Sequence, residues 1–308
     1  MIKGKPSVLY TKVTPGFFHI VCYCHEQEEN ATMIELPEAL TIAAQMNEAL
    51  KGKRIESCIR GNIPHRFTFY SRPPAEYEAI LKDKLIGVVQ YHGSAILTST
   101  EPDYVLVLGD GGERILFHQS DKTLPKKHQL LLRFHDGTSL TVTVQGWGNA
   151  LLLHNADLAN HPHVGKDKVS ALSDMFTYDH FCGLLRELGE EDQRSVKYFV
   201  ISKPGIWGVG NGYLQDILFR AKIHPKRRAI DLGEQERQAL YEAIVTTLQQ
   251  ATDLGGRDSE RDLYNRLGRY SRVLGIKQVG QPCPECRTVI RKVQYLGGAS
   301  YFCPRCQT

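Results

Sequence analysis

Apolar side chains recur at helical spacing in two parts of the chain. In the first part, Leu36, Leu40 and Ala43 fall on one helical face until Gly52 ends the pattern, so we expect a helix over residues 37–51. The second part contains four further stretches with this period: Asp174–Leu188, Ser195–Ile201, Gly212–Ala221 and Glu234–Leu254. The pattern therefore predicts one leading helix and a helical region in the C-terminal half.

The segment between these two parts is dominated by short runs rich in Val, Ile, Leu and Thr. The runs are Lys84–Thr98, Asp103–Leu108, Gln129–His135 and Ser139–Val144. Turn formers separate them at Asp110–Gly112 and at Asp136-Gly137. Several short strands at this spacing predict an antiparallel sandwich or barrel, with Tyr77–Leu81 as a brief helical insertion.

These patterns divide the chain into four expected regions: 1–32, 33–160, 170–275 and 276–308. The first carries turn formers and balanced charge, and we interpret it as an N-terminal extension or as the product of a misassigned start codon. The others predict an α+β multi-domain protein with a β-sandwich followed by helices and a cysteine-rich end. No apolar run approaches the ~20 residues of a membrane span, so we expect a cytoplasmic protein without a membrane partner.

Charge is distributed unevenly along the chain. Residues 196–308 carry 18 Lys and Arg against 10 Asp and Glu, whereas residues 1–195 carry 20 against 24. A basic C-terminal third favours a polyanionic partner, with nucleic acid first among the candidates. The alternative is a basic surface that only contacts solvent.

Four of the eight cysteines lie near the C-terminus in two closely spaced pairs. Cys283 and Cys286 form the first pair, and Cys303 and Cys306 follow after sixteen intervening residues. This spacing is typical of a four-thiolate Zn²⁺ site, which leaves no open coordination position and is structural. The alternatives are a redox dithiol or chance spacing. We expect the remaining cysteines to be unpaired thiols: Cys22, Cys24, Cys58 and Cys182. The alternative for Cys22 and Cys24 is a metal site with His25, for which no second ligand pair is visible.

A glycine-rich turn lies between two of the expected helices. Gly208, Gly210 and Asn211 allow a tight turn followed by exposed N–H groups at a helix start, which can bind a phosphate. Six basic or imidazole side chains follow within the next stretch: Arg220, Lys222, His224, Lys226, Arg227 and Arg228. A purely structural turn between helices is the alternative.

Four segments in the same chain resemble one family. They are Ile34–Glu38 (IELPE), Ala171–Asp174 (ALSD), Gly208–Pro225 (GVGNGYLQDILFRAKIHP) and Val279–Gln307 with its four cysteines. Together they resemble the formamidopyrimidine-DNA glycosylase and endonuclease VIII superfamily of base-excision repair enzymes. The resemblance implies a helix–two-turn–helix domain over 170–275, a zinc finger over 276–308, and double-stranded DNA with damaged bases or abasic sites as the partner.

The resemblance also implies a mechanism. In this family an N-terminal proline amine attacks the sugar C1′ of a flipped nucleotide, and the resulting Schiff base permits strand elimination. Glu35 matches the family's catalytic glutamate and is the expected proton shuttle, while Asn211 matches its phosphate-binding asparagine. The nucleophile position holds Ile34, whose nitrogen is an amide here, so the free amine would belong to Met33 in a chain that begins there.

Three other positions depart from the family pattern. Ser94 stands where the family usually has a catalytic lysine, and Gly298 stands where a zinc-finger arginine usually binds a phosphate. Lys292 or Arg291 could substitute for that arginine. Trp147, within Gln145–Gly148, stands in the void-filling segment and could stack in the gap left by a flipped base or serve as a core aromatic.

Two hypotheses follow from these matches and departures. The first is a monomeric, nucleoid-associated bacterial DNA glycosylase with abasic-site lyase activity that uses an N-terminal amine and Glu35. The second is a non-catalytic protein that binds damaged or distorted DNA on the same scaffold. A zinc-ribbon protein acting on RNA is disfavoured, because the segment Gly208–Pro225 is specific to the DNA repair family.

Overall fold

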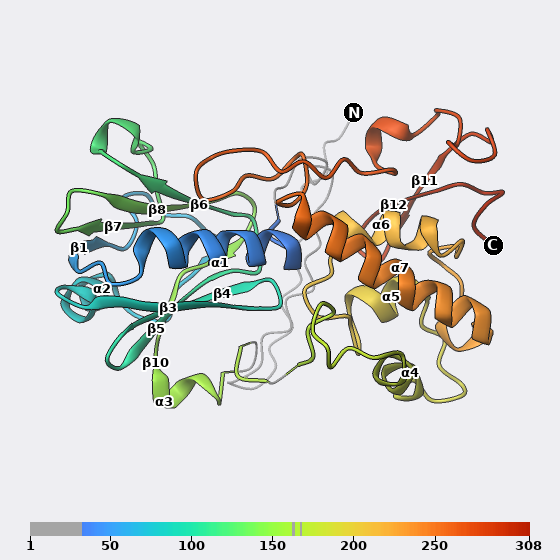
Figure 1. Cartoon of the computed structure of the whole chain (residues 1–308), viewed down its shortest axis with the longest axis horizontal. Helices are drawn as coiled ribbons and strands as arrows, with labels where there is room; N and C mark the ends of the chain where they lie inside the picture. The colour runs from blue at the N-terminus through green and yellow to red at the C-terminus, as the bar shows by residue number, and fades with distance from the viewer. Residues whose placement is uncertain (1–32, 162–163, 167) are drawn as a thin grey trace, which may run out of the picture.

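The computed structural model describes residues 33–161, 164–166 and 168–308. The expected extension over residues 1–32, with Cys22 and Cys24, lies outside the described residues. Two parts lie next to each other: a β-sandwich built from the first half of the chain and a helical part built from the second half (Figure 1). The α+β class expected from the hydrophobic pattern is confirmed.

The sandwich consists of two four-stranded antiparallel sheets. The first sheet has the order β1 (Ile55–Ile59), β7 (Leu130–Phe134), β8 (Ser139–Val144) and β6 (Glu113–His118). The second has the order β10 (Leu151–His154), β5 (Tyr104–Gly109), β4 (Ala95–Glu101) and β3 (Leu85–His92). A short parallel pair joins β2 (Thr68–Phe69) to β9 (Gly148–Asn149). The helices α2 (Pro74–Leu81) and α3 (Asn155–Leu158) complete this part.

Helix α1 (Leu36–Leu50) belongs to the sandwich but reaches the helical part. Its side chains Ile42, Met46 and Leu50 are buried in the sandwich core, because apolar residues recur on one face of the helix. Leu36, at its first turn, packs instead in the core of the helical part. The N-terminal end of α1 therefore lies at the junction of the two parts (Figure 1).

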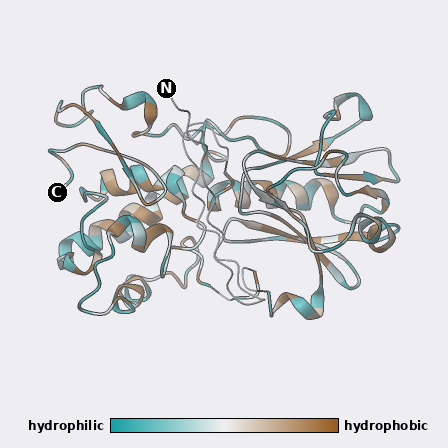
Figure 2. Cartoon of the chain, turned by 180° about the vertical axis from the view of Figure 1, so that it is seen from behind, coloured by the Kyte–Doolittle hydropathy of each residue, from teal (hydrophilic) through white to brown (hydrophobic). Residues whose placement is uncertain are grey.

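The helical part packs around the long helix α7. Its members are α4 (Tyr178–Arg186), α5 (Val196–Ile201), α6 (Asn211–Arg220) and α7 (Glu234–Asp253). Phe181, Phe199 and Ile244 are among the buried side chains of its core. The helices and the inner strands carry most of the hydrophobic colour in Figure 2, whereas several outer loops are hydrophilic. No helix among the described residues is long and apolar enough to cross a membrane.

A two-stranded hairpin near the C-terminus packs against α6. It pairs β11 (Arg291–Tyr295) with β12 (Gly298–Phe302). Gln215 of α6 fixes it, because its amide nitrogen donates to Ala299 O at 3.3 Å and its amide oxygen accepts from Tyr301 N at 3.0 Å. The turn of the hairpin is thereby held beside the N-terminal half of α6.

Two elements differ from the sequence expectation. The run Lys84–Thr98 is broken into two strands, because Gly93 adopts a left-handed conformation (φ +63°) that reverses the chain. The helix expected from Asp174 begins only at Tyr178, since the Thr177 hydroxyl accepts a hydrogen bond from His180 N and caps the helix there.

Candidate functional site

Glu35 lies at the junction of the two parts, between the beginnings of α1 and α6. It is the N-cap of α1, and its backbone N–H donates to the Glu38 carboxylate at 3.1 Å. Its own carboxylate turns toward α6 and accepts hydrogen bonds from Gly210 N and Gly212 N, both at 2.8 Å. The positive end of the α6 dipole therefore faces this carboxylate.

Arg257 completes this carboxylate cluster from the loop that follows α7. Its Nη1 lies 3.0 Å from Glu35 Oε1, and its Nε lies 3.2 Å from Glu38 Oε1. The Tyr213 hydroxyl also donates to Glu38 Oε1 at 2.6 Å. The side chains of the ion-paired residues are only 3–4% exposed. Arg257 carries no recognisable signal in the sequence, because an arginine in a polar connector has no distinguishing spacing.

Burial controls the protonation of this cluster. Burial raises the pKa of Glu35, although the Arg257 guanidinium and the N–H groups of Gly210 and Gly212 oppose the shift. Burial also raises the pKa of Glu260 to about 7, with Arg257 again opposing. Burial alone would lower the pKa of Arg257, but the carboxylates of Glu38 and Glu35 hold it well above its ordinary value. The cluster thus combines a guanidinium that stays charged with two buried carboxyl groups, Glu35 and Glu260, whose pKa values burial raises.

The peptide bond between Met33 and Ile34 is held on both sides. Ile34 N donates to Gly111 O at 2.9 Å, and Met33 O accepts a hydrogen bond from Arg257 Nη2. The Ile34 side chain is buried in the sandwich core with 4% exposure. Ile34 nitrogen is therefore an engaged amide, and the next nitrogen toward the N-terminus is that of Met33.

The glycine-rich turn and the hairpin turn meet on one face. Gly208 adopts φ +82°, and a Cβ there would lie 2.8 Å from Leu36 Cβ, so only glycine fits. Asn211, the first residue of α6, is exposed. A Cβ on Gly298 would lie 3.0 Å from Asn211 Nδ2. Asn211 and the hairpin turn, which the family resemblance relates to two phosphate-binding positions, thus lie side by side.

Neither basic residue suggested as a substitute lies at the hairpin turn. Gly298 pairs with Tyr295, whereas Lys292 pairs with Tyr301. The two pairs are three residues apart along the strand, which corresponds to about 10 Å. Lys292 is half-buried and Arg291, one residue further from the turn, is exposed. Both residues therefore lie on β11 away from the hairpin turn that contains Gly298.

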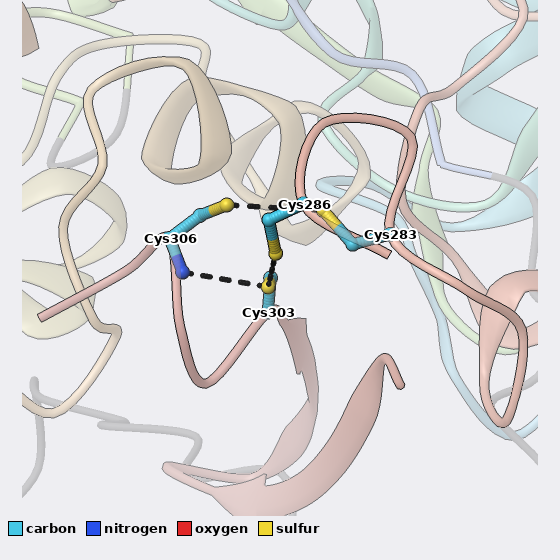
Figure 3. A group of neighbouring side chains, drawn as sticks. All are labelled: Cys283, Cys286, Cys303 and Cys306. Carbon is cyan, nitrogen blue, oxygen red and sulfur yellow. Dashed lines mark hydrogen bonds between the residues drawn. The ribbon is translucent and has the colours of Figure 1, made fainter. Parts of the chain in front are cut away.

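The four C-terminal cysteines converge on one point (Figure 3). Their sulfur atoms all lie within 4.8 Å of one another. The Cys283–Cys306 and Cys286–Cys303 sulfur separations are 3.8 Å and 3.4 Å. Tetrahedral Zn²⁺ with bonds of ~2.3 Å places its sulfur ligands about 3.8 Å apart. The thiolate set and its spacing therefore fit a structural zinc ion. Among the cysteines that the structure describes, Cys58 and Cys182 are free thiols.

Comparison with known proteins agrees with this geometry. The H2TH domain of formamidopyrimidine-DNA glycosylase matches residues 169–262, and the zinc finger found in FPG and IleRS matches residues 280–308. The formamidopyrimidine-DNA glycosylase of Halalkalibacterium halodurans is 31% identical over 284 residues, which cover 89% of this chain and all of that relative. The chain belongs to the formamidopyrimidine-DNA glycosylase family.

Other family members show the same coverage. The formamidopyrimidine-DNA glycosylase of Cytobacillus firmus is 29% identical across 89% of this chain and its own whole length. The Lactococcus lactis Fpg, solved in complex with DNA containing an abasic site, has a TM-score of 0.76 at 23% identity, and the match covers 89% of this chain and 99% of that structure. This structural likeness establishes that the fold is shared.

Within this family fold, the position expected for a lysine carries no cation. The Ser94 hydroxyl donates to Asp110 Oδ1, and Asp110 N donates to Ser94 O at 3.0 Å. Asp110 adopts a left-handed conformation (φ +67°), which is uncommon for residues other than glycine. Ser94, in the turn between β3 and β4 where the family resemblance implies a lysine, is thus bound to Asp110 in the turn between β5 and β6.

Trp147 and Glu113 lie together at the neighbouring turn. Trp147 is half-buried between β8 and β9, and its carbonyl accepts a hydrogen bond from Gly112 N at 2.7 Å. Glu113 is buried beneath it, and its Oε1 accepts from Asn149 N. Burial raises the pKa of Glu113 to about 8. Glu113 therefore supports the turn that carries Trp147.

A buried lysine, which the sequence did not reveal as important, supports the hairpin turn. Lys197 is fully buried, and its ammonium donates to Tyr295 O at 2.7 Å and to Ser300 Oγ at 3.1 Å. It lies in the short apolar helix α5, where a single lysine gives no recognisable signal. Its contacts fix the hairpin next to Asn211.

Proposed function

We propose that this protein binds double-stranded DNA that contains damaged bases or abasic sites, excises the damaged base and cleaves the strand by β-elimination. The observation that carries the proposal is the placement of Glu35. Its carboxylate lies at the α6 N-terminus beside exposed Asn211 and next to the held Met33–Ile34 peptide. The relatives named above are glycosylases, and the Lactococcus lactis Fpg was solved with abasic-site DNA.

In this proposal the domains have separate tasks. The β-sandwich over residues 33–160 presents the N-terminal segment and Glu35. The helical domain over 170–275 and the zinc finger over 276–308 bind the DNA backbone through Asn211 and their basic surface. Trp147 stacks in the gap left by the flipped nucleotide, a contact worth ~1–3 kcal/mol by analogy with single-strand binding platforms. We expect the protein to act as a monomer at the bacterial nucleoid.

The nucleophile in this proposal is the α-amine of Met33 in a chain that begins there. Ile34 cannot serve, because its nitrogen is an amide that donates to Gly111 O. A primary amine forms a Schiff base with the sugar C1′ as a secondary amine does. Glu35 then moves the protons that base departure and elimination require.

Two specific observations favour a second candidate function, a non-catalytic protein that binds damaged DNA. Ser94 is bound to Asp110, and Gly298 leaves the hairpin turn without an arginine. Such a protein would retain the DNA-binding surface but lack glycosylase and lyase activity.

An incision assay distinguishes the two functions. Duplexes carrying an abasic site or an oxidised base should be incised by the chain beginning at Met33, and Glu35→Gln should abolish incision while gel-shift affinity changes little. Tight binding without incision by the unmodified protein would instead establish the non-catalytic function. Absence of preference for damaged over intact duplex would refute both.

A further inference from the structure

Glu260 is a buried carboxyl group to which neither the sequence nor the proposed function assigns a role. It follows α7 in the same loop as Arg257 and is 7% exposed. Two backbone hydrogen bonds fix its position: Glu260 N donates to Arg257 O at 3.0 Å, and Gly268 N donates to Glu260 O at 3.1 Å. Its carboxylate lies 3.8 Å from Arg257 Nη2.

The Glu260 carboxylate lies close to Met33, because Arg257 Nη2 donates to Met33 O and lies 3.8 Å from Glu260 Oε1. The backbone N–H of Met33 in turn lowers the pKa of Glu260. That nitrogen cannot move far, because the peptide that follows it is held by Arg257 at Met33 O and by Gly111 at Ile34 N. Arg257 thus holds both partners, since its Nη2 reaches the Met33 carbonyl as well as the Glu260 carboxylate. Arg257 and Glu260 of the loop after α7 therefore both lie beside the backbone of Met33.

We propose that Glu260 is a catalytic acid–base group for the Met33 amine, accepting its proton before attack and returning one when water leaves. This inference rests on the proposed function, because a free amine exists at Met33 only in a chain that begins there. An unperturbed α-amine has a pKa of about 7.7–8.0, so it is largely protonated and unreactive at neutral pH. A carboxylate within hydrogen-bond reach can take that proton directly.

The proton balance of the step on an abasic site is complete. The Met33 ammonium gives one proton to Glu260, and the nitrogen lone pair forms a bond to the C1′ aldehyde carbon. A second amine proton moves to the former carbonyl oxygen, giving a neutral carbinolamine. Glu260 returns its proton to that hydroxyl, the carbon–oxygen bond breaks, and water leaves as the protonated imine forms. Glu260 ends as the carboxylate with which it began.

The charged surroundings of Glu260 suit this exchange. Burial raises its pKa to about 7, while Arg257 lowers it and the carboxylates of Glu38 and Glu35 raise it. Because burial disfavours two separated charges, it favours proton transfer from the ammonium to the carboxylate within the pair. Glu35 has both oxygens engaged with α6 and Arg257, so it does not compete for the Met33 nitrogen.

The experiment compares the full chain with a chain beginning at Met33. The shorter chain retains every described core residue, and the Halalkalibacterium halodurans relative is matched over its whole length by 89% of this chain. Each protein is mixed with abasic-site duplex and borohydride, which reduces the imine to a stable amine. Intact mass confirms that Met33 is retained, and mass spectrometry of the tryptic peptide covering residues 33–51 locates the attachment. The rate of covalent trapping is measured from pH 5.5 to 8.5.

The shorter chain should be trapped on the Met33 amine, and the full chain, whose Met33 nitrogen is an amide, should not. Glu260→Gln should slow trapping at neutral pH by at least about tenfold and shift the pH dependence toward that of the free amine. Asp258→Asn is the matched control, since it removes a negative charge from the same loop at an exposed position. It should leave the rate and pH profile unchanged. Gel-shift affinity for an abasic-site analogue verifies that each variant is folded.

The possible outcomes separate the two proposals. Trapping on Met33 with an unchanged rate and pH profile in Glu260→Gln would overturn the role of Glu260 and leave the lyase function standing. Trapping of neither chain would overturn the Schiff-base function. Equal trapping of both chains on a lysine would overturn the assignment of the amine, and with it the role of Glu260.

Discussion

Replacing Arg257 by methionine should destabilise the protein strongly and in a pH-dependent way. Methionine preserves much of the side-chain volume but removes the guanidinium. It leaves the Glu35 and Glu38 carboxylates buried at 3% exposure without their cation. Breaking a buried ion pair from one side typically costs ~3–5 kcal/mol. Because Arg257 contacts the carboxylates of Glu35, Glu38 and Glu260 and the Met33 carbonyl, we expect a loss of that order at pH 8.

The loss of unfolding free energy in Arg257→Met should be smaller at lower pH. In the variant the folded-state pKa of Glu35 rises further above its ordinary value of 4.5, since burial raises it already and Arg257 no longer opposes. A carboxyl with a raised folded-state pKa destabilises the fold increasingly as pH rises through the interval above 4.5. Glu260, whose pKa is about 7, loses the same opposing cation. The penalty should therefore be largest at pH 8 and clearly smaller at pH 5.

Urea unfolding at pH 5 and pH 8 measures the loss of unfolding free energy and its dependence on pH. Arg266→Met is the matched control, because Arg266 pairs with Asp262 while its side chain is 67% exposed. Such surface pairs contribute about 0–1 kcal/mol. Adding Glu35→Gln to Arg257→Met should recover part of the loss. A pH-independent loss below ~1 kcal/mol would show that Arg257 does not compensate the buried carboxylates.

Three further predictions concern the DNA-binding face and the zinc site. Asn211→Ala should weaken binding of all duplex sequences and lower the slope of log affinity against log salt by about 1 if Asn211 contacts one phosphate. An unchanged slope would show that Asn211 does not contact a phosphate. Trp147→Ala should weaken binding of abasic-site duplex by ~1–3 kcal/mol and leave intact duplex unaffected, whereas equal weakening of both would assign Trp147 a structural role. Chelation of zinc, or Cys303→Ser, should unfold the hairpin and abolish DNA binding while the sandwich stays folded. Elemental analysis measures the bound zinc and circular dichroism measures the remaining folded structure. Retained DNA binding at full affinity would contradict this prediction.

Much of the fold follows from local patterns in the sequence. The leading helix is predicted well because apolar residues recur at helical spacing until Gly52: the pattern predicts a helix over 37–51, and the structure places α1 over Leu36–Leu50. The zinc site is predicted equally well from the sequence, since the ligand spacing alone indicates that the sulfurs of Cys283 and Cys303 converge, as the structure shows. Structural features that depend on a few neighbouring residues can therefore be predicted without knowledge of the tertiary contacts.

The carboxylate cluster could be predicted only in part. Glu35 and Asn211 were found because they lie within motifs that resemble a family. Arg257 and Glu260 were missed, because their importance comes from contacts more than 200 residues away along the chain, such as the 3.0 Å contact between Arg257 Nη1 and Glu35 Oε1. Long-range pairing of single charged residues leaves no periodic or spacing signal.

The most direct test of the proposed chemistry is the mass of the protein after borohydride treatment with abasic-site DNA. The chain beginning at Met33 should gain the mass of the reduced DNA adduct on its N-terminal amine, and the full chain should gain none at that position. An unmodified mass for the shorter chain, under conditions where it binds the same duplex, would contradict the proposed enzyme and support a protein that only binds damaged DNA.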